Sequence, residues 1–135
     1  MPKIVDHQRR RIEILEGCLV LFATEGYEQL SMRQMASSLG VTTGTVYHYF
    51  SSKQQIFEEL FGLLQDRDIR TVTAQISPDL SVSERLKVLH DFLLENVDRL
   101  SDILKITLEY RRIQKLESNQ ILEDFIGAYR QAVME

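Results

Sequence analysis

The chain of 135 residues has one cysteine, two prolines, six glycines and no tryptophan. A single cysteine, Cys18, excludes a disulfide within the chain and a cysteine-rich zinc site. The histidines His7, His48 and His90 are far apart and lack the spacing of metal ligands, so we expect no metal and no cofactor. Because prolines and glycines are too few for the frequent turns of a sandwich or barrel, we predict an all-α protein.

Long apolar runs are missing as well. None approaches the roughly 20 residues that a membrane-spanning helix needs, and the N-terminus has no apolar stretch of the signal-peptide type. With 44% hydrophobic and 27% charged residues, the composition is that of an ordinary globular protein. We therefore expect a cytoplasmic protein.

The chain also has no excess of positive charge. Its formal net charge is −4 at pH 7, which by itself disfavours nucleic-acid binding. Residues 1–54, however, hold six basic and five acidic groups, and the remaining residues hold ten basic and fifteen acidic groups. The acidity therefore lies in the C-terminal part, and this modest asymmetry leaves nucleic-acid binding by the N-terminal part open.

Apolar residues recur at helical spacing near the N-terminus. The steps of three and four residues predict a helix, and Cys18 on the same face is expected to pack as a small core residue. Gly26 is a natural left-handed stop for this helix. The apolar positions that define it are Ile12, Leu15, Leu19, Phe22 and Ala23.

Two short helices are predicted next. Ser31 and Gln34 form a capping-box pattern that begins the first of them, and Gly40 ends it. Val41 fills a tight turn, after which Thr42 is placed to cap the second helix. Two short helices joined by such a turn are typical of a helix-turn-helix, although an ordinary helical hairpin has the same pattern. The residues expected to face inward are Met32, Met35, Ala36, Leu39, Val46 and Phe50.

Four more helices are predicted after Phe50. Ser52 and Gln55 repeat the capping-box pattern and begin a helix that extends to about residue 75. Pro78 interrupts the helical pattern, and Ser81 with Glu84 makes another box, so we place a break near residues 77–82. The last three helices run through Leu86, Leu89, Leu93, Val97 and Leu100, then over residues 103–112, then through Ile121, Leu122, Phe125, Ile126, Tyr129 and Val133.

The stretch LSMRQMASSLGVTTGTVYHYFSSKQQIFEEL, residues 30–60, resembles the DNA-binding domain of TetR-family transcriptional regulators. Its ordered landmarks are Ser31, Ala36, Gly40-Val41, the aromatic run from Tyr47 to Phe50, and Lys53, and upstream LFATEGYEQLS is similar to the end of the family's first helix. The resemblance implies a helix-turn-helix DNA-binding domain over residues 1–52 and a helical effector-binding and dimerisation domain over residues 53–135. Because family members are longer, we expect the second domain to be shortened at its C-terminus.

The resemblance also implies how such a chain works. A homodimer would place two reading helices in successive major grooves of a near-palindromic, double-stranded operator. A small-molecule effector bound by the helical C-terminal domain would release the DNA. We therefore expect a ligand-responsive transcriptional repressor, although an activator would need the same parts.

The DNA contacts need little charge on the reading helix itself, because a helix N-terminus carries a partial positive charge. The Arg9–Arg11 cluster is expected to add full charges near the phosphates. The pattern leaves open that Tyr47 only packs, that His48 is an exposed spacer and that the arginines form a solvated face or a disordered tail. The phosphate contacts we predict are Ser31, Arg33, Thr42, Tyr47, Tyr49 and Lys53, and the base-reading positions are Thr43, Gly44, Thr45 and His48.

Residues 104–133 resemble the corresponding segment of the fatty-acid-responsive branch of this family, in which acyl-CoA is the effector. An apolar tunnel would hold the acyl chain, and Arg111 or Arg112 would meet a charged head group. Apolar stripes at helical spacing, however, more often belong to a protein core than to a pocket. We therefore expect a lipophilic effector, with acyl-CoA as one form of it, and assign no residues to its site.

Catalytic patterns are lacking. The sequence has no nucleophile elbow, phosphate loop or metal cluster. We therefore expect that the protein is not an enzyme. The alternative function is a helical protein–protein adaptor that has lost DNA binding. Ser31, Tyr47 and Lys53 argue against it, because an adaptor needs no phosphate clamp, and salt-dependent DNA affinity separates the two.

Overall fold

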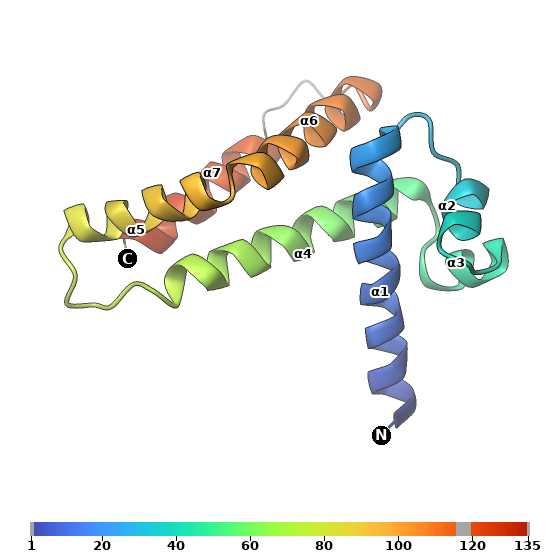
Figure 1. Cartoon of the computed structure of the whole chain (residues 1–135), viewed down its shortest axis with the longest axis horizontal. Coiled ribbons are helices and arrows are strands. Elements are labelled where there is room, and N and C mark those ends of the chain that lie inside the picture. The colour runs from blue at the N-terminus through green and yellow to red at the C-terminus, as the bar shows by residue number, and fades with distance from the viewer. Residues whose placement is uncertain (1, 116–119, 135) are drawn as a thin grey trace. The chain divides into compact units, whose positions relative to one another are not determined.

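The computed structural model describes the backbone of residues 2–115 and 120–134, and the side chains of residues 6–115, 123, 126–131 and 134. Within these residues the chain forms α-helices and no strand (Figure 1), which confirms the predicted all-α class. The helices are α1 Pro2–Glu25, α2 Met32–Ser38, α3 Thr43–Tyr49, α4 Lys53–Thr73, α5 Val82–Glu95, α6 Val97–Ile113 and α7 Gln120–Met134.

The chain divides into two compact units, Met1–Gly62 and Leu63–Glu135. The first unit includes the first turns of α4, because Ile56, Phe57 and Leu60 are buried there. The predicted division after residue 52 concerns function, and it stays a prediction.

The core of the first unit begins on one face of α1. Cys18 is fully buried, and burial raises the pKa of its thiol to about 12, as expected of a core residue. Ala23 is exposed, so its predicted inward position is wrong. The buried stripe runs through Cys18 and Phe22, and the next residue along a helix is turned by about 100° from its predecessor.

The predicted end of α1 at Gly26 is confirmed. Gly26 has φ 83° and donates its N–H to the carbonyl oxygen of Phe22 at 3.0 Å. Beyond it, the rings of Phe22, Tyr27 and Phe57 lie with centroids 5.5 to 6.0 Å apart. This aromatic group joins the end of α1 to the start of α4.

Gly17 on α1, which the sequence analysis did not select, lies against Leu39 at the end of α2. A Cβ atom at Gly17 would lie 2.2 Å from Cδ2 of Leu39, so the Leu39 side chain would have to move to admit one. Leu39 itself is only half-buried, whereas Ala36 is buried as predicted.

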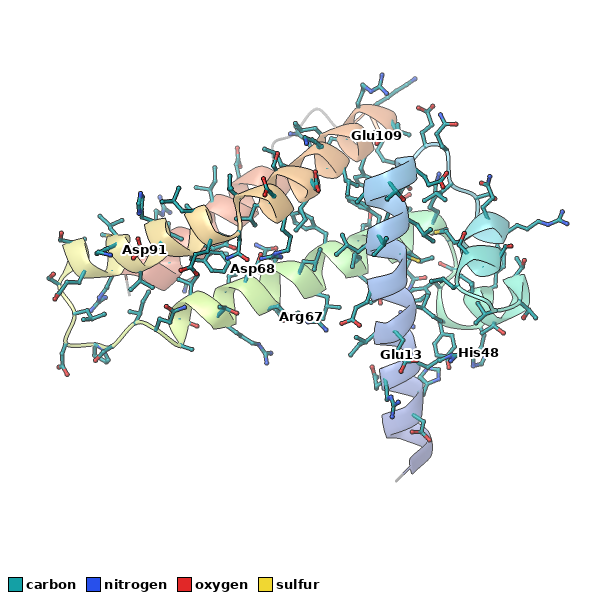
Figure 2. The ribbon with its side chains drawn as sticks, viewed as in Figure 1. Glu13, His48, Arg67, Asp68, Asp91 and Glu109 are labelled. Atoms are coloured by element: carbon teal, nitrogen blue, oxygen red, sulfur yellow. The ribbon has the colours of Figure 1, made fainter. Side chains whose placement is uncertain are left out.

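The second unit has its own core, formed by Val72, Phe92 and Tyr129 with half-buried aliphatic residues around them. Asp68 on α4 is buried and accepts a hydrogen bond from the guanidinium of Arg99 on α6 at 2.6 Å (Figure 2). The ion pair joins the two helices and compensates a carboxylate that would be costly to bury alone.

The helix predicted through Leu86 and Leu100 is divided. α5 ends at Glu95 and α6 begins at Val97 (Figure 1), and Asn96 between them has φ −115° and ψ 14°. The carbonyl oxygen of Phe92 accepts both the backbone N–H of Asn96 at 3.2 Å and its side-chain amide at 2.8 Å. The following helix therefore begins before Ile103, not at it.

Several of the apolar residues that marked the helices of the second unit are exposed. They are Leu86, Leu93 and Val97 on α5 and α6, and Ile126 on α7. Tyr129, by contrast, is buried. The side chains of Ile121, Leu122, Phe125 and Val133 lie outside the described residues.

Candidate nucleic-acid interface

α2 begins with the predicted capping box. The Ser31 hydroxyl accepts the N–H of Gln34 at 3.1 Å, and the Gln34 side chain accepts the N–H of Ser31 at 2.8 Å. Met32 and Met35 are buried on the inner face, which leaves Arg33 exposed on the outer one. The Ser31 oxygen is thus occupied as an acceptor, and its O–H group is the donor that a phosphate contact would use.

The turn after α2 is closed by two backbone bonds. Gly40, at φ 68°, donates to the carbonyl oxygen of Ser37, and Val41 donates to that of Ala36. These two bonds together form the Schellman arrangement, which stops a helix where a left-handed residue follows it. The predicted roles of Gly40 and Val41 are therefore confirmed.

Thr42 caps α3 as predicted. Its hydroxyl accepts the N–H of Thr45 at 3.1 Å and lies 2.8 Å from the hydroxyl of Thr45. The two predicted DNA-contact residues are thus hydrogen-bonded to each other. This contact fixes the direction of both side chains at the first turn of α3.

α3 has one buried and one exposed face. Val46 and Phe50 are buried as expected, whereas Gly44, Tyr47 and His48 are exposed. Tyr47 leaves 53% of its surface exposed, which argues against a purely packing role. The predicted base-reading positions therefore lie on the solvent side of this helix, with Thr43 and Thr45 at its half-buried margin.

Gly44 is not required by the fold. A Cβ atom there would meet nothing closer than Thr42 Oγ1 at 3.9 Å. The glycine therefore leaves a backbone surface without a side chain on the exposed face of α3. This is consistent with the predicted close approach of the backbone to DNA bases.

The three adjacent arginines separate into two roles. Arg9 and Arg10 are exposed on α1, where both pair with Glu13. Arg11 points inward: it binds the Glu59 carboxylate, donates to the carbonyl oxygen of Tyr49 and lies 4.4 Å from the Phe50 ring centroid. Arg11 therefore holds α1, α3 and α4 together, and only Arg9 and Arg10 have the exposure that DNA contact needs.

Lys53 is held by the fold. Its Nζ donates to the carbonyl oxygen of Tyr27 at 2.7 Å and lies 4.3 Å from the centroid of the Tyr27 ring. Nearby, the Ser52–Gln55 capping box is only half formed. Ser52 accepts the N–H of Gln55, but the Gln55 side chain accepts from Ser51 instead of Ser52.

One residue of this surface was missed in the sequence analysis. The ring of His7, on α1, stacks on that of Tyr49 with centroids 4.7 Å apart. His7 shares a helix face with Arg11, four residues on, but no sequence pattern pairs it with α3. The half-buried state of Tyr49 follows from this contact.

Other classes of site find no support in the part of the chain that has been described. Those residues contain no group of three or more histidine, cysteine, aspartate or glutamate side chains that could hold a metal ion. Among them, no helix is long and apolar enough to cross a membrane.

Residues 14–60 match the sequence profile of the family described as "Bacterial regulatory proteins, tetR family". The chain is 30% identical over 124 residues to the HTH-type transcriptional repressor AcnR of Corynebacterium diphtheriae. The alignment covers 87% of this chain and 61% of AcnR. It is 26% identical over 135 residues to the nucleoid occlusion factor SlmA of Salmonella newport. This alignment covers 95% of this chain and 68% of SlmA. The chain thus spans 61% of the length of AcnR.

Solved structures share this fold. The fatty acid degradation regulator FadR of Bacillus halodurans superposes with a TM-score of 0.74 at 24% identity, covering 93% of this chain and 66% of FadR. The ketosteroid transcriptional regulator KstR2 of Mycobacterium tuberculosis superposes with a TM-score of 0.63 at 25% identity. The superposition covers 90% of this chain and 61% of KstR2.

Proposed function

We propose that residues 14–60, which match the profile of the tetR family of bacterial regulatory proteins, form a DNA-binding domain, and that the chain is a transcriptional regulator that acts in the cytoplasm. The observation that carries the proposal is the exposed face of α3, where Gly44, Tyr47 and His48 stand beside the Thr42 cap. Polar groups at the start of a short helix behind a tight turn suit entry into the major groove.

We propose that the regulator binds a near-palindromic operator as a homodimer. A single helix of seven residues reaches only a few base pairs, so one copy alone reads too little sequence for a specific site. Two copies related by a two-fold axis read two half-sites about one helical turn apart. Repression is the favoured outcome because the similar protein AcnR is named a repressor.

We propose further that a small lipophilic effector binds the second unit and releases the DNA. A hollow of about 440 Å³ in this unit is large enough for a small ligand. Arg111 and Arg112, which the sequence suggested for a charged head group, are not among its lining residues. These are Ile69, Thr73, Ile76, Pro78, Arg85, Ala128 and Gln131.

The chemical class of the effector is drawn from similar proteins. FadR is named for fatty acid degradation and KstR2 for ketosteroids, and both classes are lipophilic. The probes to test are therefore a long-chain acyl-CoA, the matching free acid and a steroid ketone. A ligand that raises the melting temperature of the protein and lowers its DNA affinity would support this part of the proposal.

The alternative is a helical adaptor that does not bind DNA, and one experiment separates it from the regulator. The purified protein is mixed with fragmented genomic DNA at moderate salt, and the retained DNA is sequenced. Enrichment of a near-palindrome supports a dimeric regulator, and its half-site spacing measures the separation of the two α3 helices.

A salt titration on the enriched duplex completes this test. Affinity should fall steeply as salt rises, because protein cations displace counterions from the phosphates. Tyr47→Ala should weaken binding without unfolding the protein, since Tyr47 is exposed. Leu94→Ala on α5, which is exposed as well, serves as the matched control. Absence of both enrichment and salt-dependent binding would favour the adaptor.

A further inference from the structure

Three rings from two helices form a cluster at the surface of the first unit. His7 on α1 stacks on Tyr49 with centroids 4.7 Å apart and planes inclined by 28°. His48 meets both edge-on, at 5.8 Å from His7 and 5.2 Å from Tyr49. We call His7, His48 and Tyr49 the ring cluster; Figure 2 labels His48 beside α1.

The ring cluster rests on a rigid base. The backbone carbonyl of Tyr49 accepts a hydrogen bond from Arg11, whose guanidinium also binds Glu59 of α4 and covers the ring of Phe50. Phe50 is buried, so the backbone below the cluster cannot move easily. The rings above it are exposed or half-buried, and therefore the direction of each ring depends on its neighbours.

His7 decides the direction of the other two rings. Tyr49 has one face against the imidazole of His7, and the edge contact with His48 fixes the angle between the two α3 side chains. Without His7, both side chains would regain rotational freedom, which has to be lost again when they bind a partner. A ring on α1 thus orders the C-terminal turn of α3.

The groups around the ring cluster carry charges of both signs. On α1 the charged neighbours of His7 are Asp6, Arg10 and Arg11, of which Arg10 pairs with Glu13 and Arg11 with Glu59 of α4. From α3, His48 and Tyr49 face it. An imidazole N–H group can donate a hydrogen bond to a phosphate oxygen. Phenol O–H groups are donors to phosphate oxygens.

We infer that His7 is a positioning residue of the DNA-binding surface, which holds Tyr49 and His48 toward the phosphate backbone of duplex DNA. The inference rests on the proposed function, because it needs the surface of α3 to meet DNA. His7 acts through its stacked ring.

The test measures binding of the enriched duplex by fluorescence anisotropy. His7→Ala should weaken binding about fivefold, the effect of losing one hydrogen bond from the Tyr49 phenol to a phosphate. His7→Phe keeps a stacking ring, so it should bind within about twofold of the parent. His90→Ala, a change of an exposed histidine on α5, is the matched control.

A double-mutant cycle distinguishes positioning from a separate contact. Tyr49→Phe removes the phenol O–H, and it should weaken binding in the parent but have little further effect in the His7→Ala background. Unfolding curves of each variant check that the domain remains folded. Additive effects of the two changes, or equal DNA affinity of His7→Ala and the parent, overturn the inference. In either case, DNA binding by the parent still supports the proposed function. Failure of the parent to bind any DNA overturns both.

Discussion

The ammonium of Lys53 donates a hydrogen bond to the carbonyl oxygen of Tyr27 at 2.7 Å and covers the face of the same residue's ring. Lys53 is the first residue of α4, and Tyr27 follows the glycine that ends α1. The contact therefore joins two helix ends and holds a long, flexible side chain in one direction. A phosphate that meets this ammonium would find it already ordered, which lowers the entropy cost of the contact.

Lys53→Ala should change both stability and DNA binding. Loss of the charged hydrogen bond and of the cation–ring contact should lower the free energy of unfolding by about 1–2 kcal/mol. Loss of a phosphate contact should reduce the slope of log affinity against log salt by about one unit. Urea unfolding and a salt titration measure the two effects separately.

The matched control is Lys53→Arg, which keeps the positive charge and should keep the parent's salt slope. If the alanine variant has the same slope as the parent while its stability falls, Lys53 serves the fold alone.

Gly44→Ala should stabilise the protein and weaken its DNA binding. Alanine forms helix better than glycine by about 0.8–1 kcal/mol, and the nearest atom to the new methyl group is 3.9 Å away. The same methyl group would separate α3 from the bases, so we expect about a tenfold loss of affinity, or 1.4 kcal/mol. Gly127→Ala on α7, where a Cβ meets nothing within 4 Å, should stabilise without this loss. If Gly44→Ala binds DNA as tightly as the parent, the backbone at this residue does not come close to the DNA bases.

Arg11 and Glu59 should be strongly coupled in unfolding experiments. Each single change to alanine leaves one half-buried charge without its partner, and should cost about 2 kcal/mol. The double variant should lose clearly less than the sum of the two. Arg9→Ala, which breaks only an exposed pair with Glu13, should cost under about 0.5 kcal/mol. Additive losses for Arg11 and Glu59 would contradict the direct pairing.

Stability should fall in alkaline solution because of Tyr129. Burial, and then the negative charge of Asp68, raises the pKa of its phenol from 10.0 to about 12. Since the folded state holds the proton more tightly, the stabilisation is complete below pH 10 and is lost as pH rises from 10 to 12. The loss should be on the order of 2 kcal/mol. Tyr129→Phe cannot ionise, so its free energy of unfolding should decline less steeply over this range; an unchanged slope would contradict the assignment.

Much of the local structure was predictable because its causes lie within three or four residues of one another. Ser31 with Gln34, Thr42 with Thr45 and Ser81 with Glu84 all cap helices as expected. The second unit was less predictable. The apolar spacing continues through Asn96, so the sequence pattern did not predict that α5 ends at Glu95 and α6 begins at Val97.

The sequence by itself determined the helical class, the turn between α2 and α3 and the buried and exposed faces of α3. These follow from local hydrogen bonds and from the repeat of the helix. Only the tertiary structure decided that Arg11 points inward while Arg9 stays exposed, and that His7 lies against Tyr49. Adjacent arginines have the same helix propensity and charge, so packing against Glu59 and Phe50 distinguishes them. Contacts between residues distant in the chain depend on how whole helices pack, and no local pattern encodes them.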